Sequence, residues 1–277
     1  MGEIVEISIV LYRISYKGED RVYIERGREM YLELLKKTIL FEIWQEYEQD
    51  LVSDLQKYPV KNRAVDPEKH RMGEIWPKFA HSMIGHVRMD NLQMCMETVL
   101  KDNIEGDFIE TGVWRGGSCI FMRGFLKVHE IENRKVWLAD SFQGLPASNE
   151  EKYPSDRLLN WLHTIDYLCV SLEEVQNNFR KYDLLDENVR FLKGWFKDTL
   201  PTAPIEKLAI LRLDGDLYES TMDSLTNLYN KVSDGGFIIV DDYFLPPCKA
   251  AVTDFHRKCG IQASLVPIDN HSVYWRK

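Results

Sequence analysis

The sequence has neither an excess of basic residues nor a long apolar run. Its 35 Lys and Arg residues stand against 44 Asp and Glu residues, which gives a net charge of −9. Nucleic-acid binding needs a basic face for the phosphates, so we expect no nucleic-acid partner. No apolar run reaches the roughly 18 residues that a membrane span requires. The N-terminus also lacks the basic and apolar regions of a secretory signal, and we therefore expect a cytoplasmic protein without membrane contact.

Cysteine pairs are missing as well. The chain has five cysteines, an odd number, and no CxxC motif joins any two of them. Structural zinc sites and disulfide scaffolds depend on such spacing. We therefore predict free thiols in a reducing compartment.

The C-terminal two thirds of the chain alternate between short apolar runs and amphipathic stretches. This alternation is typical of a parallel sheet covered by helices. Two further runs, at residues 263–268 and 272–275, flank Asp269-Asn270 and predict a hairpin at the edge of the sheet. The pattern predicts an α/β fold with a mostly parallel, seven-stranded sheet and helices on both faces. Its five expected parallel strands are residues 106–110, 135–140, 189–192, 208–213 and 236–240.

The N-terminal third has a different pattern. Alternating residues suggest an edge strand or arm at 3–16, whereas apolar residues at helical spacing predict helices from residue 27 to about 58. A long loop at 59–77 and a helix at 88–101 follow. We therefore divide the chain into an N-terminal arm (1–26), a helical and loop segment that covers the active site (27–104) and an α/β core (105–277).

The stretch from residue 142 to 188 is longer than a strand–helix–strand crossover needs. A capping box at residues 171–174 predicts that a helix begins there. The surplus before it, residues 146–169, is rich in aromatic side chains and includes His163. It is either a surface excursion or a lid over the edge of the sheet, and we favour the lid.

A glycine-rich loop follows the first expected core strand. The dinucleotide fingerprint G-x-G-x-x-G is absent from it. Instead, Glu110 ends the strand, Gly112 and Gly116 follow, and Ser118 begins the next helix. Glycines there allow the backbone to approach a ligand closely, and Rossmann-like methyltransferases hold S-adenosylmethionine in this way. The alternative is a glycine turn that only packs the strand against the helix.

Asp140 favours the ligand-binding interpretation. It ends the second core strand, where an acid can accept hydrogen bonds from both hydroxyls of a ribose. A solvated acid at a strand end is the alternative.

Two acidic groups follow the last two parallel strands: Asp214 and Asp216 in one, Asp241 and Asp242 in the other. Because such strand ends converge in space, Asp214, Asp241 and Asp242 are expected to form a cage of oxygen ligands for Mg²⁺ or a similar cation. Without a cation, crowded carboxylates would raise each other's pKa. A solvated acidic turn is the alternative. The lack of a His/Cys cluster disfavours zinc.

Asp216 is close enough to the expected cage to take part in chemistry. A carboxylate beside a cation can take a proton from a hydroxyl whose pKa the cation has lowered. The same acid could instead favour the N-terminus of the helix that follows it. Both roles are compatible.

Several segments together resemble the macrocin/mycinamicin O-methyltransferase family, which includes an enzyme that methylates the sugar of an aminocoumarin antibiotic. The resemblance extends from about Arg28 to the C-terminus. It is carried by the segments REMYLELLKKT, AHSMIGHVRMDNLQ, GDFIETGVWRGGS, VRFLKGWFKDTLP, LRLDGDLYESTMDSLTNLY and GGFIIVDDYFLP. The resemblance implies a Rossmann-like class I methyltransferase that uses S-adenosylmethionine.

The resemblance also implies roles for individual residues. Asp214, Asp241 and Asp242 would hold Mg²⁺, and Asp216 would be the general base. The residues that would line the methyl-donor site are Glu110, Gly112, Ser118, Asp140 and Ser141, with Met83 and Ile84 covering the donor and Trp195 near its adenine end.

We therefore predict a Mg²⁺-dependent O-methyltransferase of secondary metabolism. Its substrate would be a hydroxyl on a sugar or polyol of a small molecule, and the enzyme is expected to be a homo-oligomer. The alternatives are a nicotinamide-dependent oxidoreductase and a non-catalytic binding protein on the same sheet. If Asp216 is not the base, His163 in the expected lid is the next candidate.

Overall fold

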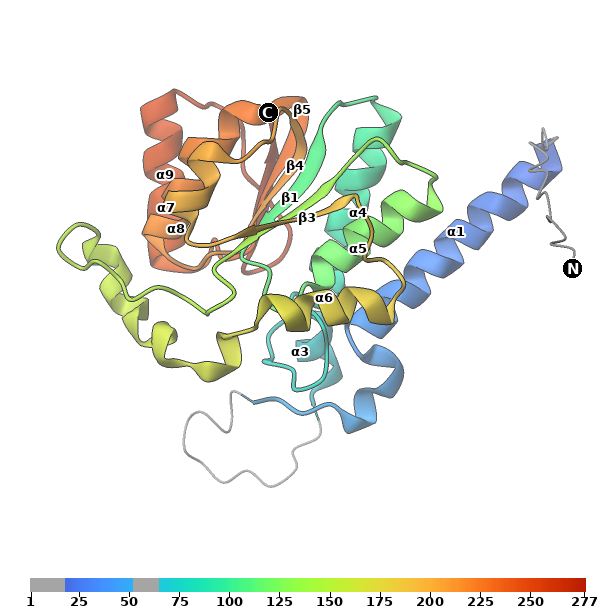
Figure 1. The fold of residues 1–277 in the computed structure, drawn as a ribbon, viewed down its shortest axis with the longest axis horizontal. Coiled ribbons are helices and arrows are strands. Elements are labelled where there is room, and N and C mark those ends of the chain that lie inside the picture. The colour runs from blue at the N-terminus through green and yellow to red at the C-terminus, as the bar shows by residue number, and fades with distance from the viewer. Residues whose placement is uncertain (1–17, 52–64) are drawn as a thin grey trace, which may run out of the picture.

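The five expected core strands form the parallel part of one sheet in the computed structural model, which describes residues 18–51 and 65–277. An antiparallel hairpin completes the sheet beside the last of them. The strand order is β3-β2-β1-β4-β5-β7-β6, so the seven-stranded prediction is confirmed (Figure 1). The strands are β1 (Asp107–Thr111), β2 (Val136–Asp140), β3 (Val189–Lys193), β4 (Leu208–Leu213), β5 (Val232–Val240), β6 (Val266–Pro267) and β7 (Val273–Arg276).

The order of the strands reverses between β1 and β4. On one side the chain proceeds from β1 to β2 and β3, and on the other side from β4 to β5. Thr111 pairs with Leu213, and Leu213 pairs with Val240. The residues that follow these strands therefore lie side by side at the carboxyl edge, which is where open α/β sheets bind their ligands.

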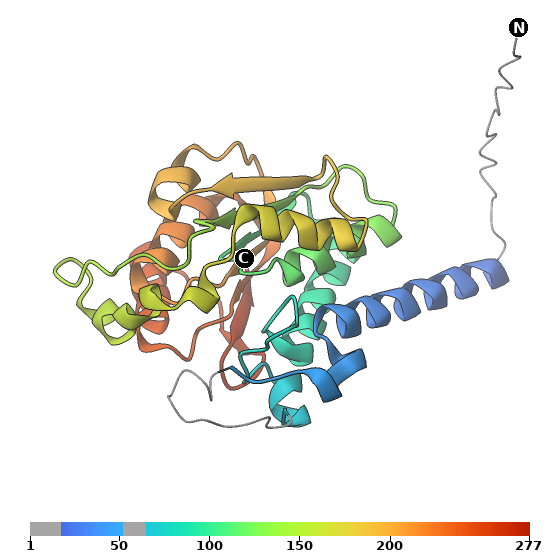
Figure 2. The same cartoon turned by 60° about the horizontal axis from the view of Figure 1, so that its bottom comes forward.

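Helices cover both faces of the sheet (Figures 1 and 2). One face carries α4 (Gly85–Lys101), α5 (Gly117–Val128) and α6 (Leu172–Lys181). The other face carries α7 (Phe196–Thr199), α8 (Tyr218–Leu228) and α9 (Pro246–Cys259), with the short turns η4 (Leu200–Thr202) and η5 (Tyr229–Lys231).

The alternation of buried residues along the strands builds a separate core on each face. Phe108, Leu138 and Ile210 pack on the side of α4 and α5, whereas the adjacent residues Ile109 and Leu211 pack on the side of α8 and α9. Burial on both faces fixes the register of the sheet, because a slip of one residue would exchange the two sets.

The N-terminal segment differs in its details from the prediction. The first helix, α1 (Gly18–Ile39), begins nine residues before the expected start at residue 27, so the expected boundary between residues 26 and 27 falls within it. A short turn, η1 (Glu42–Tyr47), follows, and the expected loop at 59–77 contains α3 (Pro67–Arg71). α3 begins at a proline that Asp66 caps, two start signals that the loop interpretation overlooked. The expected arm at 3–16 lies outside the described residues.

The segment at 146–169 packs below α8 and α9 (Figure 1). It contains two 3₁₀ turns, η2 (Pro154–Thr164) and η3 (Asp166–Leu168). The predicted helix start is confirmed, since Ser171 is the N-cap of α6 and its hydroxyl accepts a hydrogen bond of 3.1 Å from the Glu174 backbone N–H.

All five cysteines are free, as predicted, and Cys95, Cys119 and Cys248 are buried. Among the described residues, no helix combines the length and the apolar character needed to cross a membrane.

Candidate active site

A cavity of about 630 Å³ opens at the carboxyl edge of the sheet, where the strand order reverses. Its floor contains all four acids predicted for this edge, Asp214, Asp216, Asp241 and Asp242. The segment at 146–169 forms part of its wall, with Pro146, Leu159, Trp161, Leu162 and Leu168. The segment that was expected to be a lid therefore borders the predicted site.

The structure brings Asp214, Asp241 and Asp242 together. Each offers one carboxylate oxygen, and these oxygens lie within 4.8 Å of one another. Burial and then the charge of Asp241 raise the pKa of Asp214 to about 7. Burial and the charges of Asp216, Asp214 and Asp241 raise the pKa of Asp242 well above its ordinary value. The cluster thus favours a bound cation over a set of ionised carboxylates on their own.

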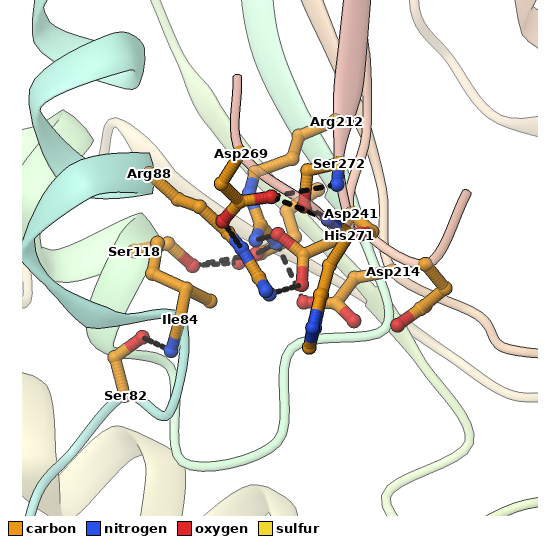
Figure 3. Close-up of polar contacts among 12 residues, drawn as sticks. Ser82, Ile84, Arg88, Ser118, Arg212, Asp214, Asp241, Asp269, His271 and Ser272 are labelled. Carbon is orange, nitrogen blue, oxygen red and sulfur yellow. Dashed lines mark hydrogen bonds and ion pairs between the residues drawn. The ribbon is translucent and has the colours of Figure 1, made fainter. Parts of the chain in front are cut away.

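Two buried arginines, which the sequence interpretation missed, partly neutralise the cluster (Figure 3). Arg212 lies on β4 and forms ion pairs with Glu110, Asp214 and Asp241. Arg88 reaches from α4, with its Nη1 2.8 Å from Asp241 and its Nε 2.7 Å from Asp269.

A signal for Arg212 was present in the sequence, because it interrupts the apolar run of residues 208–213. A charge inside a buried strand requires a partner of opposite charge. Arg88 stands on a helix face that the spacing alone does not link to the sheet edge, so no comparable signal marked it.

The two arginines do not pair with all three carboxylates of the cluster, and the arrangement of these carboxylates suits a divalent cation. Neither arginine forms an ion pair with Asp242 in the described part of the chain. The Asp242 carboxylate accepts a hydrogen bond of 3.1 Å from the backbone N–H of Asp216. Three carboxylates with converging oxygens are a ligand set that Mg²⁺ and similar hard cations accept.

Asp216 lines the cavity beside this cluster. Its backbone has a φ of 57°, an uncommon conformation for a residue other than glycine. In this conformation the Asp216 backbone N–H donates its hydrogen bond to the Asp242 carboxylate. Burial and the charge of Asp241 raise its pKa to about 6.

On the other side of the cavity lie the residues expected at the methyl-donor site. Gly112 has a φ of 89°, and a Cβ added to it would lie 1.7 Å from the backbone oxygen of Asp214. Only glycine fits where these two loops meet. Asp140 accepts hydrogen bonds from the backbone N–H groups of Val113 and Phe142, at 2.8 and 2.7 Å, and burial raises its pKa. Ser141, Met83 and Trp195 line the same cavity.

Three predicted donor-site residues lie behind the cavity wall instead. The Glu110 carboxylate is buried and accepts a hydrogen bond of 2.5 Å from the Ser118 hydroxyl. Arg212 pairs with the same carboxylate and links it to the acid cluster. Ile84 is 2 % exposed and packs in the core at the start of α4. These side chains support the loops of the site rather than line the cavity.

The cavity has further walls that the sequence interpretation did not identify. Phe244 and His271 stack with ring centroids 4.4 Å apart, and Trp76 stacks on Tyr167 at 5.4 Å. Of these four, Phe244, His271 and Trp76 line the cavity. They come from loops far apart in the chain, so no local spacing could have grouped them. His163 is exposed and is not among the residues that line the cavity.

Comparison with known sequences agrees with this geometry. Residues 28–277 match the model of the macrocin-O-methyltransferase (TylF) family. The chain is 49% identical to demethyldecarbamoylnovobiocin O-methyltransferase of Streptomyces niveus, over 90% of this chain and 93% of that protein. It is 48% identical to mycinamicin III 3''-O-methyltransferase of Micromonospora griseorubida, over 91% of this chain and 97% of that one.

Solved structures agree on the fold. The O-methyltransferase NovP superposes with a TM-score of 0.83 at 49% identity, covering 90% of this chain and 99% of NovP. The calicheamicin methyltransferase CalS11 shares the fold, with a TM-score of 0.53 at 16% identity over 95% of this chain and 94% of that one. The chain belongs to the macrocin-O-methyltransferase family and is an O-methyltransferase with a Rossmann-like methyltransferase fold.

Proposed function

We propose that this enzyme transfers a methyl group from S-adenosylmethionine to a hydroxyl of a sugar or polyol on a secondary metabolite, with the help of Mg²⁺. The observation that carries the proposal is the position of the Asp214, Asp241 and Asp242 carboxylates at the same cavity as Gly112 and Asp140. The relatives support the acceptor class, since one is named for demethyldecarbamoylnovobiocin and another for the 3'' position of mycinamicin III.

The donor side of the cavity suits a nucleoside. The Asp140 carboxylate, held by two backbone N–H groups, is available to accept hydrogen bonds from ribose hydroxyls. Trp195 offers an apolar surface for a base, and Gly112 lines the cavity where its loop meets the loop of Asp214, beside which the sulfonium end would lie. S-adenosylmethionine supplies an electrophilic methyl group, so the remaining requirement is an activated acceptor oxygen.

The acid cluster would hold and activate the acceptor. A divalent cation bound by Asp214, Asp241 and Asp242 would supply the Lewis acidity that lowers the pKa of an acceptor hydroxyl. Asp216 lies within the same cavity and would take the proton from that hydroxyl. Gly112 keeps the two loops in backbone contact, which would hold the donor and the acceptor in a fixed alignment for in-line transfer.

Stabilisation by ligands provides the first test. S-adenosylhomocysteine should raise the melting temperature of the purified enzyme, whereas NAD should leave it unchanged. A larger shift with NAD would favour the oxidoreductase alternative.

The second test uses labelled donor and a set of glycosylated metabolites. Transfer of the label should stop after treatment with a chelator and return with added Mg²⁺ or Mn²⁺. Full transfer in the chelated enzyme would contradict the metal role, and transfer to no hydroxylated acceptor would favour a binding protein.

We also propose that the enzyme is a homo-oligomer. Val22, Tyr23, Met30 and Leu34 expose more than half of their surface on α1, which extends away from the sheet (Figure 2). Exposed apolar groups along one element mark association surfaces. Light scattering of the eluted protein should give a mass above the 32.5 kDa of one chain, and a monomer would contradict the proposal.

A further inference from the structure

Helix α8, which follows the loop of Asp214 and Asp216, begins without a cap of its own. Its N-cap residue is Leu217, whose side chain cannot accept a hydrogen bond from the first turn. The first backbone N–H groups of a helix have no partner within the helix and need an acceptor from elsewhere. Serine, threonine, asparagine or aspartate would normally supply that acceptor at the N-cap position.

Asp156, from the segment at 146–169, supplies the missing cap. Its Oδ1 lies 2.6 Å from the backbone nitrogen of Tyr218, and its Oδ2 lies 3.1 Å from that of Glu219. Asp156 is 0 % exposed, although it is a carboxylate on a surface segment. A buried carboxylate at a helix N-terminus is stabilised by both the N–H groups and the helix dipole.

Apolar contacts surround this polar contact. Leu159 and Leu162 of the same segment form a buried cluster with Leu217, and Leu245 packs against that cluster. Leu217 follows Asp214 by three residues, and Leu245 follows Asp242 by three. The segment therefore packs against both loops that carry the acid cluster.

We propose that Asp156 is a positioning residue that fastens the 146–169 segment over the cavity and fixes the far end of the loop carrying Asp214 and Asp216. The loop is held at its start by the hydrogen bond from the Asp214 N–H to Thr111, at 2.9 Å. Its other end is the first turn of α8, where Asp156 binds. The fastening role rests on the contacts alone, whereas the effect on metal binding rests on the proposed function.

Hydrogen exchange of the full-length enzyme, without metal or substrate, tests the fastening. In Asp156→Ala, the amides of Tyr218 and Glu219 and the peptides of the 146–169 segment should exchange about tenfold faster. Asp156→Asn retains one acceptor oxygen and should fall between the wild type and Asp156→Ala. The control is Asp166→Ala, which removes an exposed carboxylate from the same segment and should leave the exchange unchanged.

A second pair of variants tests the hydrogen-bond donor, the Tyr218 backbone N–H, rather than the Asp156 acceptor. Tyr218→Pro deletes one of the two N–H groups but retains a helix start, because proline is well tolerated at the first helical position. Tyr218→Ala loses the same side chain but keeps the N–H. The 146–169 segment should exchange about tenfold faster in the proline variant than in the alanine variant. This comparison remains informative if Asp156→Ala fails to fold.

Mn²⁺ titration distinguishes a positioning role of Asp156 from a purely structural role. Affinity for Mn²⁺ should fall about tenfold in Asp156→Ala, while affinity for S-adenosylhomocysteine stays within about twofold. Equal exchange in Asp156→Ala and the wild type, or in the two Tyr218 variants, would overturn the fastening. Unchanged Mn²⁺ affinity with faster exchange would overturn the positioning role. A wild type that does not bind Mn²⁺ would contradict the proposed function and leave the exchange result to decide the fastening.

Discussion

Two groups of three potential metal-ligating side chains lie in the described part of the structure, and they differ in how their charge is balanced. Asp214, Asp241 and Asp242 meet at the edge of the sheet, and Glu33, His86 and Asp90 meet where α1 crosses α4. In both groups the potential ligand atoms lie within 4.8 Å of one another. Proximity of potential ligand atoms therefore does not by itself identify a metal site.

The difference lies in how the charge is balanced. In the cluster between the helices, the ammonium of Lys36 lies 2.7 Å from Glu33 and 2.5 Å from Asp90, so the protein supplies its own cation between the two acids. In the cluster at the sheet edge, the arginines leave Asp242 outside their ion pairs, and a cavity opens beside it. Charge that remains unbalanced at an accessible cavity is the better indicator of a metal site.

The largest effect should come from removing one acid of each cluster in turn. Asp214→Asn and Asp241→Asn should each lower methyl transfer by about a hundredfold or more and abolish measurable Mn²⁺ binding. Asp90→Asn, the matched change in the other cluster, should alter transfer by less than about twofold. Initial rates with labelled donor and Mn²⁺ calorimetry measure both. Equal losses of methyl transfer in the variants of the two clusters would contradict the distinction drawn between them.

The next effect concerns proton transfer at the sheet edge. Asp216→Ala should reduce turnover by about a hundredfold, because general-base catalysis contributes about 10²- to 10⁴-fold. The control is Asp198→Asn, an exposed acid on α7, which should retain wild-type turnover. A loss of less than about tenfold in Asp216→Ala would assign the base to another residue.

Loss of the Lys36 ammonium, which balances Glu33 and Asp90, should affect stability rather than activity. Lys36→Met removes the ammonium nearest to Glu33 and Asp90, beside which His86 lies at 3.5 and 3.4 Å. It should lower the free energy of unfolding by about 2 kcal/mol. Urea denaturation measures this, with Lys37→Met, an exposed neighbour, as the control. Methyl transfer at a temperature where the variant is folded should stay within about twofold of the wild type. A large loss of turnover would give this cluster a role in catalysis.

The smallest effect is a dependence of stability on pH. The hydrogen bond to Glu42 raises the pKa of His86 above its ordinary value of 6.5. The stabilisation is therefore fully present below about pH 6.5 and is lost as the pH rises through the raised pKa. His86→Gln should be less stable than the wild type at about pH 6 by up to about 1 kcal/mol, and the difference should shrink towards pH 9. A difference that grows with pH would contradict the assignment.

The sequence was sufficient to predict the sheet and its acidic edge, because a strand and the residues at its end can be recognised from a short local run of residues. The run at 208–213 followed by Asp214, and the run at 236–240 followed by Asp241, identify both the strands and their shared edge. The hairpin was predicted for the same reason, and its strands β6 and β7 pair antiparallel, with Val266 opposite Tyr274.

Features that depend on distant contacts were missed. Arg88 meets Asp241 across 153 residues of sequence, and Phe244 stacks on His271 from a different loop. The pairing of Glu110 with Arg212 across 102 residues, which buries the Glu110 carboxylate, was likewise not anticipated. The start of α1 was misplaced because Gly27 was taken as the beginning of the helix, whereas the helix begins at Gly18 and continues through Gly27.

The close approach of Gly112 to Asp214 has a consequence for redesign. Since the loop of Gly112 and the loop of Asp214 meet backbone to backbone, no side chain can be introduced there to adjust the distance between them. Other walls of the cavity are built from side chains such as Trp161 and Phe244, and under the proposed function these would set the acceptor preference. Under the same proposal, replacing those side chains would change the methylated product while the contact between the two loops, and with it the alignment of donor and acceptor, is kept.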